Sequence, residues 1–166
     1  MIDSHQIILL AKKFLKSEID ALQQLTTRLD ETISQAILAI LNSKGNVVLT
    51  GVGKPYFIAQ KISSSMASTG TPSIPLHPVD ALHGDMGRIQ SGDVIIALSN
   101  SGASNEMVEF IKATKSIDVT RIAITCRPQS AMARACDIVL DLGPLKEACP
   151  IGVAPSTTST AMLALG

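Results

Sequence analysis

The segment VIIALSNSGASNE, from Val94 to Glu106, joins an unbroken apolar run to a loop of small residues. Successive apolar residues at 94–98 predict a strand buried on both faces, which is typical of a parallel sheet covered by helices. The loop at 99–104 is rich in serine, and apolar residues return at helical spacing from Met107 onward. The segment therefore predicts a strand, a hydroxyl-rich loop and the start of a helix.

The loop has the composition of an anion site. The start of a helix offers unpaired N–H groups and a partial positive charge, so a phosphate is its simplest ligand. We interpret Ser99, Ser101 and Ser104 as phosphate ligands and Asn100 as a neighbouring substrate contact. The alternative is that Ser101 or Ser104 only caps the helix.

The composition limits the class of protein. A chain of 166 residues is one ordinary domain, and a core with 2% aromatic residues must be built from aliphatic side chains. Zero net charge without a run of lysine or arginine argues against a nucleic-acid surface. No stretch approaches the roughly 18 apolar residues of a membrane span. An odd number of cysteines, none in a CxxC pair, and no signal peptide predict free thiols in the cytoplasm.

The N-terminal region, residues 1–44, predicts helical structure. Apolar residues recur every three or four positions from Ile7 to Leu41, with polar residues between them. The pattern fits one long amphipathic helix or two, with a break near Thr26–Thr27. Such a segment could cover the sheet or pack on a second subunit, and both interpretations stay open.

The remaining residues, 45–166, alternate between strands and helices. We expect strands at 46–50, 73–76, 93–98, 121–126 and 138–142. We expect helices at 58–67, 104–116, 130–136 and from 156 onward, a loop or short helix at 78–84, and a loop at 143–155. This alternation predicts a three-layer α/β/α domain with a five-stranded parallel sheet. The sequence stops within its last helix, so we expect a domain truncated at its C-terminus.

The turn after the first strand, Gly51-Val-Gly-Lys54, fits neither common nucleotide motif. A Walker A loop would need glycine where Val48 stands and serine or threonine where Pro55 stands. A dinucleotide fingerprint would need glycine in place of Tyr56. A tight turn with one lysine remains, and Pro55 suits the first turn of the helix that follows.

Chemically active side chains follow several of the predicted strands. Ligands of such sheets bind at the carboxyl ends of the strands, so these residues can converge on one pocket. The candidates are Lys54, Thr71, His77, His83, the serine loop, Glu106 and Glu147. His77 and His83, with no nearby cysteine, are weak indicators of a metal site.

Several of these motifs together resemble the sugar isomerase (SIS) domain family, and more closely its bacterial arabinose 5-phosphate isomerases. The resemblance runs from about Gly45 to the end of the chain. It rests on Gly51-Val-Gly-Lys54, Ser68-Thr-Gly-Thr-Pro72, His77-Pro78, His83-Gly-Asp85, Ser99-Asn-Ser-Gly102 and Lys146-Glu-Ala-Cys-Pro150. It implies interconversion of D-ribulose 5-phosphate and D-arabinose 5-phosphate, which in many bacteria supplies a lipopolysaccharide sugar.

The resemblance also implies roles for individual residues. Lys54, Glu106 and Glu147 match active-site residues of the family. Gly70, Thr71, His77 and His83 match its substrate contacts, and His77 also matches a site at which zinc binds and inhibits. The family needs no metal for turnover, so no cofactor is expected. Its members commonly assemble as dimers of dimers, which implies a homotetramer.

The sequence departs from the family pattern at three points. Pro55 replaces the usual small residue after the lysine. A further catalytic histidine usually lies beyond the position at which this sequence stops. Many members also carry a pair of CBS domains after the SIS domain, and we expect none here. These departures concern the activity of this chain, not the identity of the domain.

The expected chemistry is proton transfer through an enediolate. A base must reach two neighbouring carbons, and cations or donors must stabilise the enediolate oxygens. Glu147, on a proline-constrained loop, is favoured as the base, whereas Glu106, on a first helical turn, is better suited to orient Lys54. Either glutamate stays a candidate. The alternative function is a non-catalytic sugar-phosphate-binding regulatory module.

Overall fold

Five parallel strands form one sheet in the order β2-β1-β3-β4-β5. The computed structural model describes residues 3–166, so residues 1 and 2 of the predicted N-terminal segment lie outside the described residues. The strands are β1 (Val47–Gly51), β2 (Ser73–Pro75), β3 (Val94–Leu98), β4 (Thr120–Thr125) and β5 (Ile138–Asp141). The predicted five-stranded parallel sheet is confirmed, with each strand within two residues of its expected ends.

Helices alternate with these strands along the chain. They are α1 (Ser4–Thr26), α2 (Glu31–Leu41), α3 (Lys54–Ser68), α4 (Pro78–Leu82), α5 (Asn105–Ala113) and α6 (Thr157–Leu165). The predicted helix at 130–136 is wrong in type, since only a 3-10 turn at Ala133–Ala135 forms. The predicted helix at 104–116 ends at Ala113 and continues as a 3-10 turn, where a buried arginine binds the carbonyl of Thr114.

The N-terminal region forms two helices, which settles the alternative that the sequence left open. Asp30 caps α2, because its side chain accepts a hydrogen bond of 2.9 Å from the N–H of Thr32. Hydrogen bonds from Thr32, first from its hydroxyl and then from its N–H, hold the pKa of Asp30 below its ordinary value. The capped start of α2 separates it from α1.

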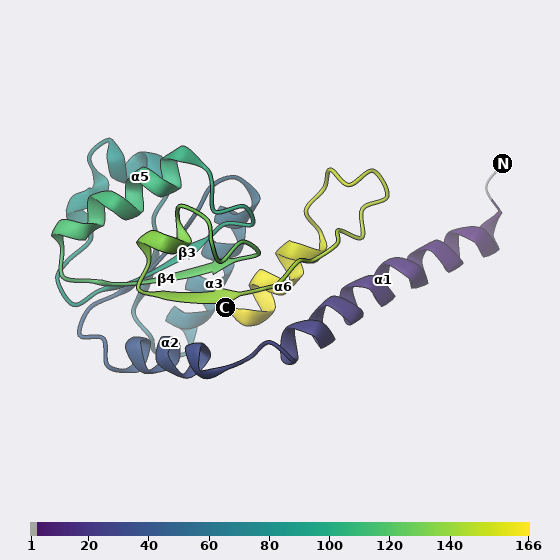
Figure 1. Cartoon of the computed structure of the whole chain (residues 1–166), viewed down its shortest axis with the longest axis horizontal. Helices are drawn as coiled ribbons and strands as arrows, with labels where there is room; N and C mark the ends of the chain where they lie inside the picture. Colours follow the sequence, from purple (N-terminus) through teal and green to yellow (C-terminus); the bar gives the residue numbers. More distant parts are fainter. Residues whose placement is uncertain (1–2) are drawn as a thin grey trace.

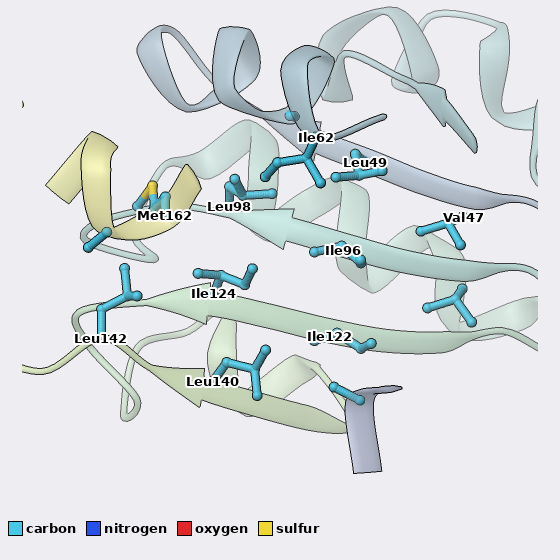
Figure 2. Packing of buried hydrophobic residues seen from close by; sticks show 14 of the residues in the cluster. Val47, Leu49, Ile62, Ile96, Leu98, Ile122, Ile124, Leu140, Leu142 and Met162 are labelled. Atoms are coloured by element: carbon cyan, nitrogen blue, oxygen red, sulfur yellow. The ribbon is translucent and has the colours of Figure 1, made fainter. Parts of the chain in front are cut away.

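The sheet is covered by helices on both faces, which confirms the three-layer architecture. One face packs against α2, α3 and α6, where residues such as Leu49, Leu98 and Met162 are almost fully buried (Figure 2). The other face packs against α4 and α5, where Ile95 and Phe110 are fully buried. Neighbouring residues of one strand enter opposite cores because successive side chains alternate across a sheet.

Helix α1 leaves the body of the domain and points outward (Figure 1). Its last turns contact α6, and only Ala21 and Leu25 are buried. Apolar side chains further toward its start remain about half exposed, namely Ile7, Ile8, Leu9, Leu10, Leu15 and Ile19. Helix α2 therefore covers the sheet, and α1 adds only Leu25 of its last turn to that core. None of the helices in the described part of the chain combines the length and hydrophobicity that a membrane crossing requires.

The order of the strands makes the chain turn in opposite directions after β1 and after β3. Strands β1 and β3 are neighbours at its centre, but the chain leaves β1 toward β2 and leaves β3 toward β4. The loops that follow β1 and β3 therefore diverge, and ligands of open α/β sheets bind at such a point.

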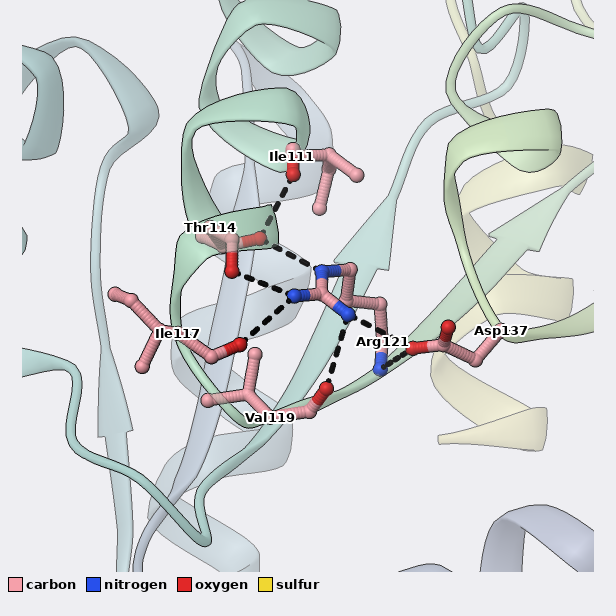
Figure 3. Close-up of polar contacts among 6 residues, drawn as sticks. All are labelled: Ile111, Thr114, Ile117, Val119, Arg121 and Asp137. Atoms are coloured by element: carbon pink, nitrogen blue, oxygen red, sulfur yellow. Dashed lines mark hydrogen bonds and ion pairs between the residues drawn. The ribbon is translucent and has the colours of Figure 1, made fainter.

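At the amino ends of the strands, a buried arginine of β4 connects the segment that follows α5 with the residue before β5 (Figure 3). Arg121 is 7% exposed. Its guanidinium donates to the carbonyls of Thr114, Ile117 and Val119 at 2.5, 3.1 and 3.0 Å. It also donates to the Thr114 hydroxyl at 2.9 Å and to the Asp137 carboxylate at 3.1 Å. One side chain thus satisfies carbonyls that would otherwise be buried without partners.

The serine loop after β3 is anchored to the loop after β4. The N–H of Gly102 donates to the Ser99 hydroxyl at 3.0 Å, and the Gly102 carbonyl accepts from the N–H of Met132 at 3.1 Å. Gly102 has a φ of +58°. A Cβ atom there would lie 2.6 Å from the Cβ of Ser130 and nearer still to its Oγ. The loop therefore needs glycine at this position, for its conformation and for the close approach.

Replacing Arg121 should destabilise the domain. Arg121→Met leaves several buried carbonyls without their donor and removes the ion pair with Asp137, so we expect the free energy of unfolding to fall by about 3 kcal/mol. Denaturant unfolding followed by circular dichroism measures the change. Arg88→Met is the matched control, because Arg88 forms only an exposed pair with Asp85, and it should change stability by less than about 0.5 kcal/mol. Equal effects of the two substitutions would contradict the structural role of Arg121.

Adding a methyl group at Gly102 should also be costly. We expect Gly102→Ala to lower the free energy of unfolding by about 2 kcal/mol, through its positive φ and the clash with Ser130. Gly87→Ala is the control, since a Cβ at Gly87 would meet no atom of the described residues within 4 Å. A Gly102→Ala protein as stable as the control would show that the loop is not anchored in this way.

Candidate active site

The serine loop leads directly into α5. Ser104 is the residue before the helix, and its side chain makes no capping hydrogen bond within the described chain. The Ser101 hydroxyl accepts a 3.3 Å hydrogen bond from the N–H of Ala103, which lies in the loop itself. The capping alternative is therefore not observed for either serine. Exposed Asn100 and Ser101 and half-buried Ser104 stand beside the first N–H groups of α5, where an anion is electrostatically favoured.

Ser99 differs from the other serines of this loop. It is 8% exposed, and its hydroxyl accepts the N–H of Gly102. The carbonyl of Asn100 accepts from the N–H of Cys126 at 3.2 Å and from the Thr125 hydroxyl at 3.1 Å. In this structure Ser99 shapes the loop from within.

The turn after β1 brings the start of α3 close to the sheet. A Cβ atom on Gly51 would lie 2.7 Å from the backbone of Pro55, so glycine is required for this approach. Lys54 is the first residue of α3, with an exposed side chain, and Pro55 occupies the first turn as expected.

Glu147 is held by the start of α6. Its Oε2 accepts hydrogen bonds of 2.8 Å from the N–H groups of Ser156 and Thr157. Its Oε1 accepts a 2.5 Å hydrogen bond from the Thr158 hydroxyl. The carboxylate therefore lies where the helix leaves N–H groups unpaired and carries a partial positive charge. The proline-rich loop sets the approach of Glu147, and α6 fixes its orientation.

Glu147 and the two strand-end loops meet in one cleft of about 300 Å³. Pro55 contributes from the start of α3, Asn100 from the serine loop, and Glu147 from its own loop. The other lining residues are Gly152, Val153, Pro155, Thr158, Ser159 and Met162. Of the candidate site residues, Asn100 and Glu147 line this cleft, whereas Lys54 and the three serines of the loop are not part of its lining.

Glu106 lies apart from this cleft. It occupies the first turn of α5 with an exposed side chain and is not part of the lining. Among the described residues, no hydrogen bond or ion pair joins Glu106 to Lys54. Orientation of Lys54 by Glu106 therefore stays a prediction.

Gly70 and Thr71 lie at the opposite edge of the sheet. Both follow the end of α3, and the neighbouring Pro72 accepts a 2.8 Å hydrogen bond from the N–H of Val47, the first residue of β1. The expectation that Thr71 shares an edge with the serine loop is wrong, because α3 returns the chain to the beginning of the next parallel strand. Gly70 and Thr71 therefore lie away from the cleft that Glu147 borders, and a substrate contact at either residue stays a prediction.

The two histidines flank α4. His77 caps its start, with Nδ1 accepting a 3.3 Å hydrogen bond from the N–H of Val79. Its ring also meets Tyr56 of α3 edge to face, with centroids 4.9 Å apart. His83 follows α4 and is exposed. Within residues 3–166 no three metal-binding side chains come together, so a zinc contact at His77 stays a prediction.

The cysteines are free, as expected, and their environments differ. Burial raises the pKa of Cys126, and it raises that of Cys136 to about 12. Backbone N–H groups of the loop after Glu147, first that of Ala154, lower the pKa of Cys149.

Sequence reasoning missed the residues that hold Glu147. The run Ser156-Thr157-Thr158 at a predicted helix start was a usable signal, because such residues present N–H and hydroxyl donors. Nothing in the sequence around Glu18 indicated a contact with the site. It lies on α1, 139 residues from its partner, and accepts a 2.9 Å hydrogen bond from the Thr157 hydroxyl.

Known proteins resemble this chain along almost its whole length. The arabinose 5-phosphate isomerase KdsD of Pseudomonas aeruginosa is 40% identical over 156 residues, which cover 94% of this chain and 48% of that protein. KdsD of Escherichia coli K12 is 43% identical over 155 residues, 93% of this chain and 47% of that protein. The chain spans about half the length of these curated relatives.

A solved structure shares both the fold and part of the sequence. It is Escherichia coli CFT073 c3406 in complex with arabinose 5-phosphate, with a TM-score of 0.93 and 33% identity, covering 98% of this chain and 87% of the other. The family model described as the SIS domain matches residues 40–166. Because that match includes the sheet, the serine loop and Glu147, the chain belongs to the SIS domain family.

Proposed function

We propose that this chain is the sugar-phosphate-binding and catalytic part of an isomerase that interconverts D-ribulose 5-phosphate and D-arabinose 5-phosphate. One observation carries the proposal: Glu147 lines the same cleft as Asn100 of the serine loop and Pro55, the neighbour of Lys54 in α3. Sequence similarity to KdsD proteins and to a protein solved with arabinose 5-phosphate supports the choice of substrate.

In the proposed mechanism the phosphate is bound at the start of α5. Ser101, Ser104 and the first N–H groups of the helix would bind its oxygens, and Asn100 would contact the substrate beside it. Binding at this remote group supplies energy that positions the reacting carbons. His77 and His83, at the ends of α4, would contact the sugar hydroxyls.

Glu147 is the proposed base. It would remove the proton from the carbon next to the carbonyl and return it to the neighbouring carbon, while Lys54 stabilises the enediolate. Each carboxylate oxygen has two lone pairs. Since Oε1 accepts a single hydrogen bond, from Thr158, one lone pair stays available for the substrate. Glu106 is the weaker candidate because its side chain is exposed on the first turn of α5, whereas Glu147 is half-buried and held by the start of α6.

We also propose that the protein works as a homo-oligomer, a tetramer by analogy with its family. The exposed apolar residues of α1 offer a surface for a second copy. The placement of Gly70 and Thr71 at the far edge of the sheet supports the same view, since a neighbouring copy is what could use them. Cytoplasmic location and a product destined for lipopolysaccharide remain parts of this proposal.

The direct test uses the full-length protein. Incubation with ribulose 5-phosphate should produce arabinose 5-phosphate, which chromatography separates from the substrate. Binding of both sugar phosphates without conversion would instead support the alternative, a non-catalytic regulatory module.

Glu147→Gln should remove the proposed base and keep the shape of the side chain. We expect the kcat of the full-length protein to fall at least ~100-fold with little change in KM. Glu109→Gln, on the exposed face of α5, is the matched control and should keep its activity. Steady-state kinetics in both directions measures the effect, and turnover near the wild-type rate would remove Glu147 from this role.

Ser101→Ala should weaken substrate binding more than it slows the chemistry. Loss of one hydrogen bond to a charged group predicts a rise in KM of about tenfold. Ser116→Ala is the control, because Ser116 is an exposed serine that ends the short turn after α5. An unchanged KM in the Ser101 variant would contradict the phosphate assignment.

A further inference from the structure

One carboxylate of α1 is turned toward the domain instead of the solvent. The Thr157 hydroxyl donates to Oε1 of Glu18 at 2.9 Å. The other oxygen, Oε2, is shielded from solvent and has no hydrogen-bond partner among the described residues. Burying a carboxylate oxygen without a donor is unfavourable. The position of Glu18 is therefore not explained by the stability of α1.

Thr157 links Glu18 to the loop that carries Glu147. Thr157 is 1% exposed. Its hydroxyl accepts a 3.0 Å hydrogen bond from the N–H of Ala148, and its own N–H donates to Glu147 Oε2 at 2.8 Å. A hydroxyl has a single hydrogen. Because Glu18 accepts that hydrogen, the lone pairs of the Thr157 oxygen face the N–H of Ala148.

Attachment of α1 to the domain does not depend on Glu18. Ala21 and Leu25, on the following turns, are each 6% exposed and already bury the end of the helix. The neighbouring charged pair, Lys16 and Asp20, is largely exposed, with a distance of 2.7 Å between its charged atoms. Neither member of the pair reaches Thr157 in the described structure, so Glu18 alone connects α1 to this hydroxyl.

We infer that Glu18 is a positioning residue that sets the Glu147 carboxylate in the cleft, acting through Thr157. Glu18 is not part of the cleft lining, so the role that we infer for it is indirect. It orients the Thr157 hydroxyl, and Thr157 holds both the Glu147 carboxylate and the next peptide N–H. The inference rests on the proposed role of Glu147 as the base.

The kinetic test uses four variants and one control variant of the full-length protein. Glu18→Ala should lower kcat about tenfold, with KM within about twofold, because a misplaced base slows proton transfer without weakening phosphate binding. Glu18→Gln keeps an oxygen that can accept from Thr157 and should recover most of the lost kcat. Thr157→Val should resemble Glu18→Ala, and the double variant should be no slower than Thr157→Val alone. Glu31→Gln, an exposed glutamate on α2, is the control and should behave as wild type.

Other kinetic outcomes would overturn the inference. Losses that multiply in the double variant would show that the two residues act separately. A loss in Glu18→Ala that Glu18→Gln does not recover, or one that appears mainly in KM, would indicate general damage.

A second measurement separates this inference from the proposed function. Amide hydrogen exchange of the segment 145–158 should be faster in Glu18→Ala than in wild type, because the Ala148 N–H and the start of α6 lose an oriented partner. Unchanged exchange would overturn the positioning role even if the enzyme is active. If the wild-type protein lacks isomerase activity but Glu18→Ala still speeds exchange, the proposed function fails and the Glu18–Thr157 link stands.

Discussion

The common direction of the five strands is the constraint on which the rest of this structure depends. Each strand must be followed by a crossover that returns the chain to the opposite edge before the next strand begins. Residues just after a strand therefore gather at one edge, and residues just before a strand gather at the other. The serine loop and Lys54 belong to the first edge, and Gly70 and Thr71 to the second.

The order of the strands adds a second consequence. The loops after β1 and β3 diverge at the centre of the sheet, and the cleft lies beside both of them. The loop after β4 then supports the serine loop from the side, through the bonds from Thr125, Cys126 and Met132. The loops of the site thus extend from β1 and β3, which are buried along their whole length.

Glu147 reaches this edge by a different route. It follows β5, the strand at the margin of the sheet, and crosses back to the start of α6. There the helix needs acceptors for its first N–H groups, and the carboxylate needs donors. The same hydrogen bonds that begin α6 therefore hold the acidic group that we propose as the base. The link from Glu18 to Thr157 extends this arrangement to α1, most of which stands clear of the domain.

Much of the fold could be predicted from the sequence. Runs such as Val94–Leu98 are apolar without interruption and are followed directly by polar residues. Both the presence of a buried strand and its bounds could therefore be predicted. The regions predicted less well lack such contrasts. Ser130–Cys136 has helical spacing over only about two turns, too short to specify the type of helix. The break between α1 and α2 depends on the cap at Asp30.

The sequence by itself determined the parallel α/β class and the serine loop, because these follow from local patterns of burial and spacing. The resemblance of its motifs to a known family added the family and the roles of Lys54 and Glu147. Only the tertiary structure decided that Glu147 is held by α6, that Gly70 and Thr71 lie at the far edge, and that Glu18 contacts Thr157. The physical reason is that these facts depend on which ends of distant elements come together. Sheet order and helix direction set those contacts over more than a hundred residues of chain, and no local pattern encodes them.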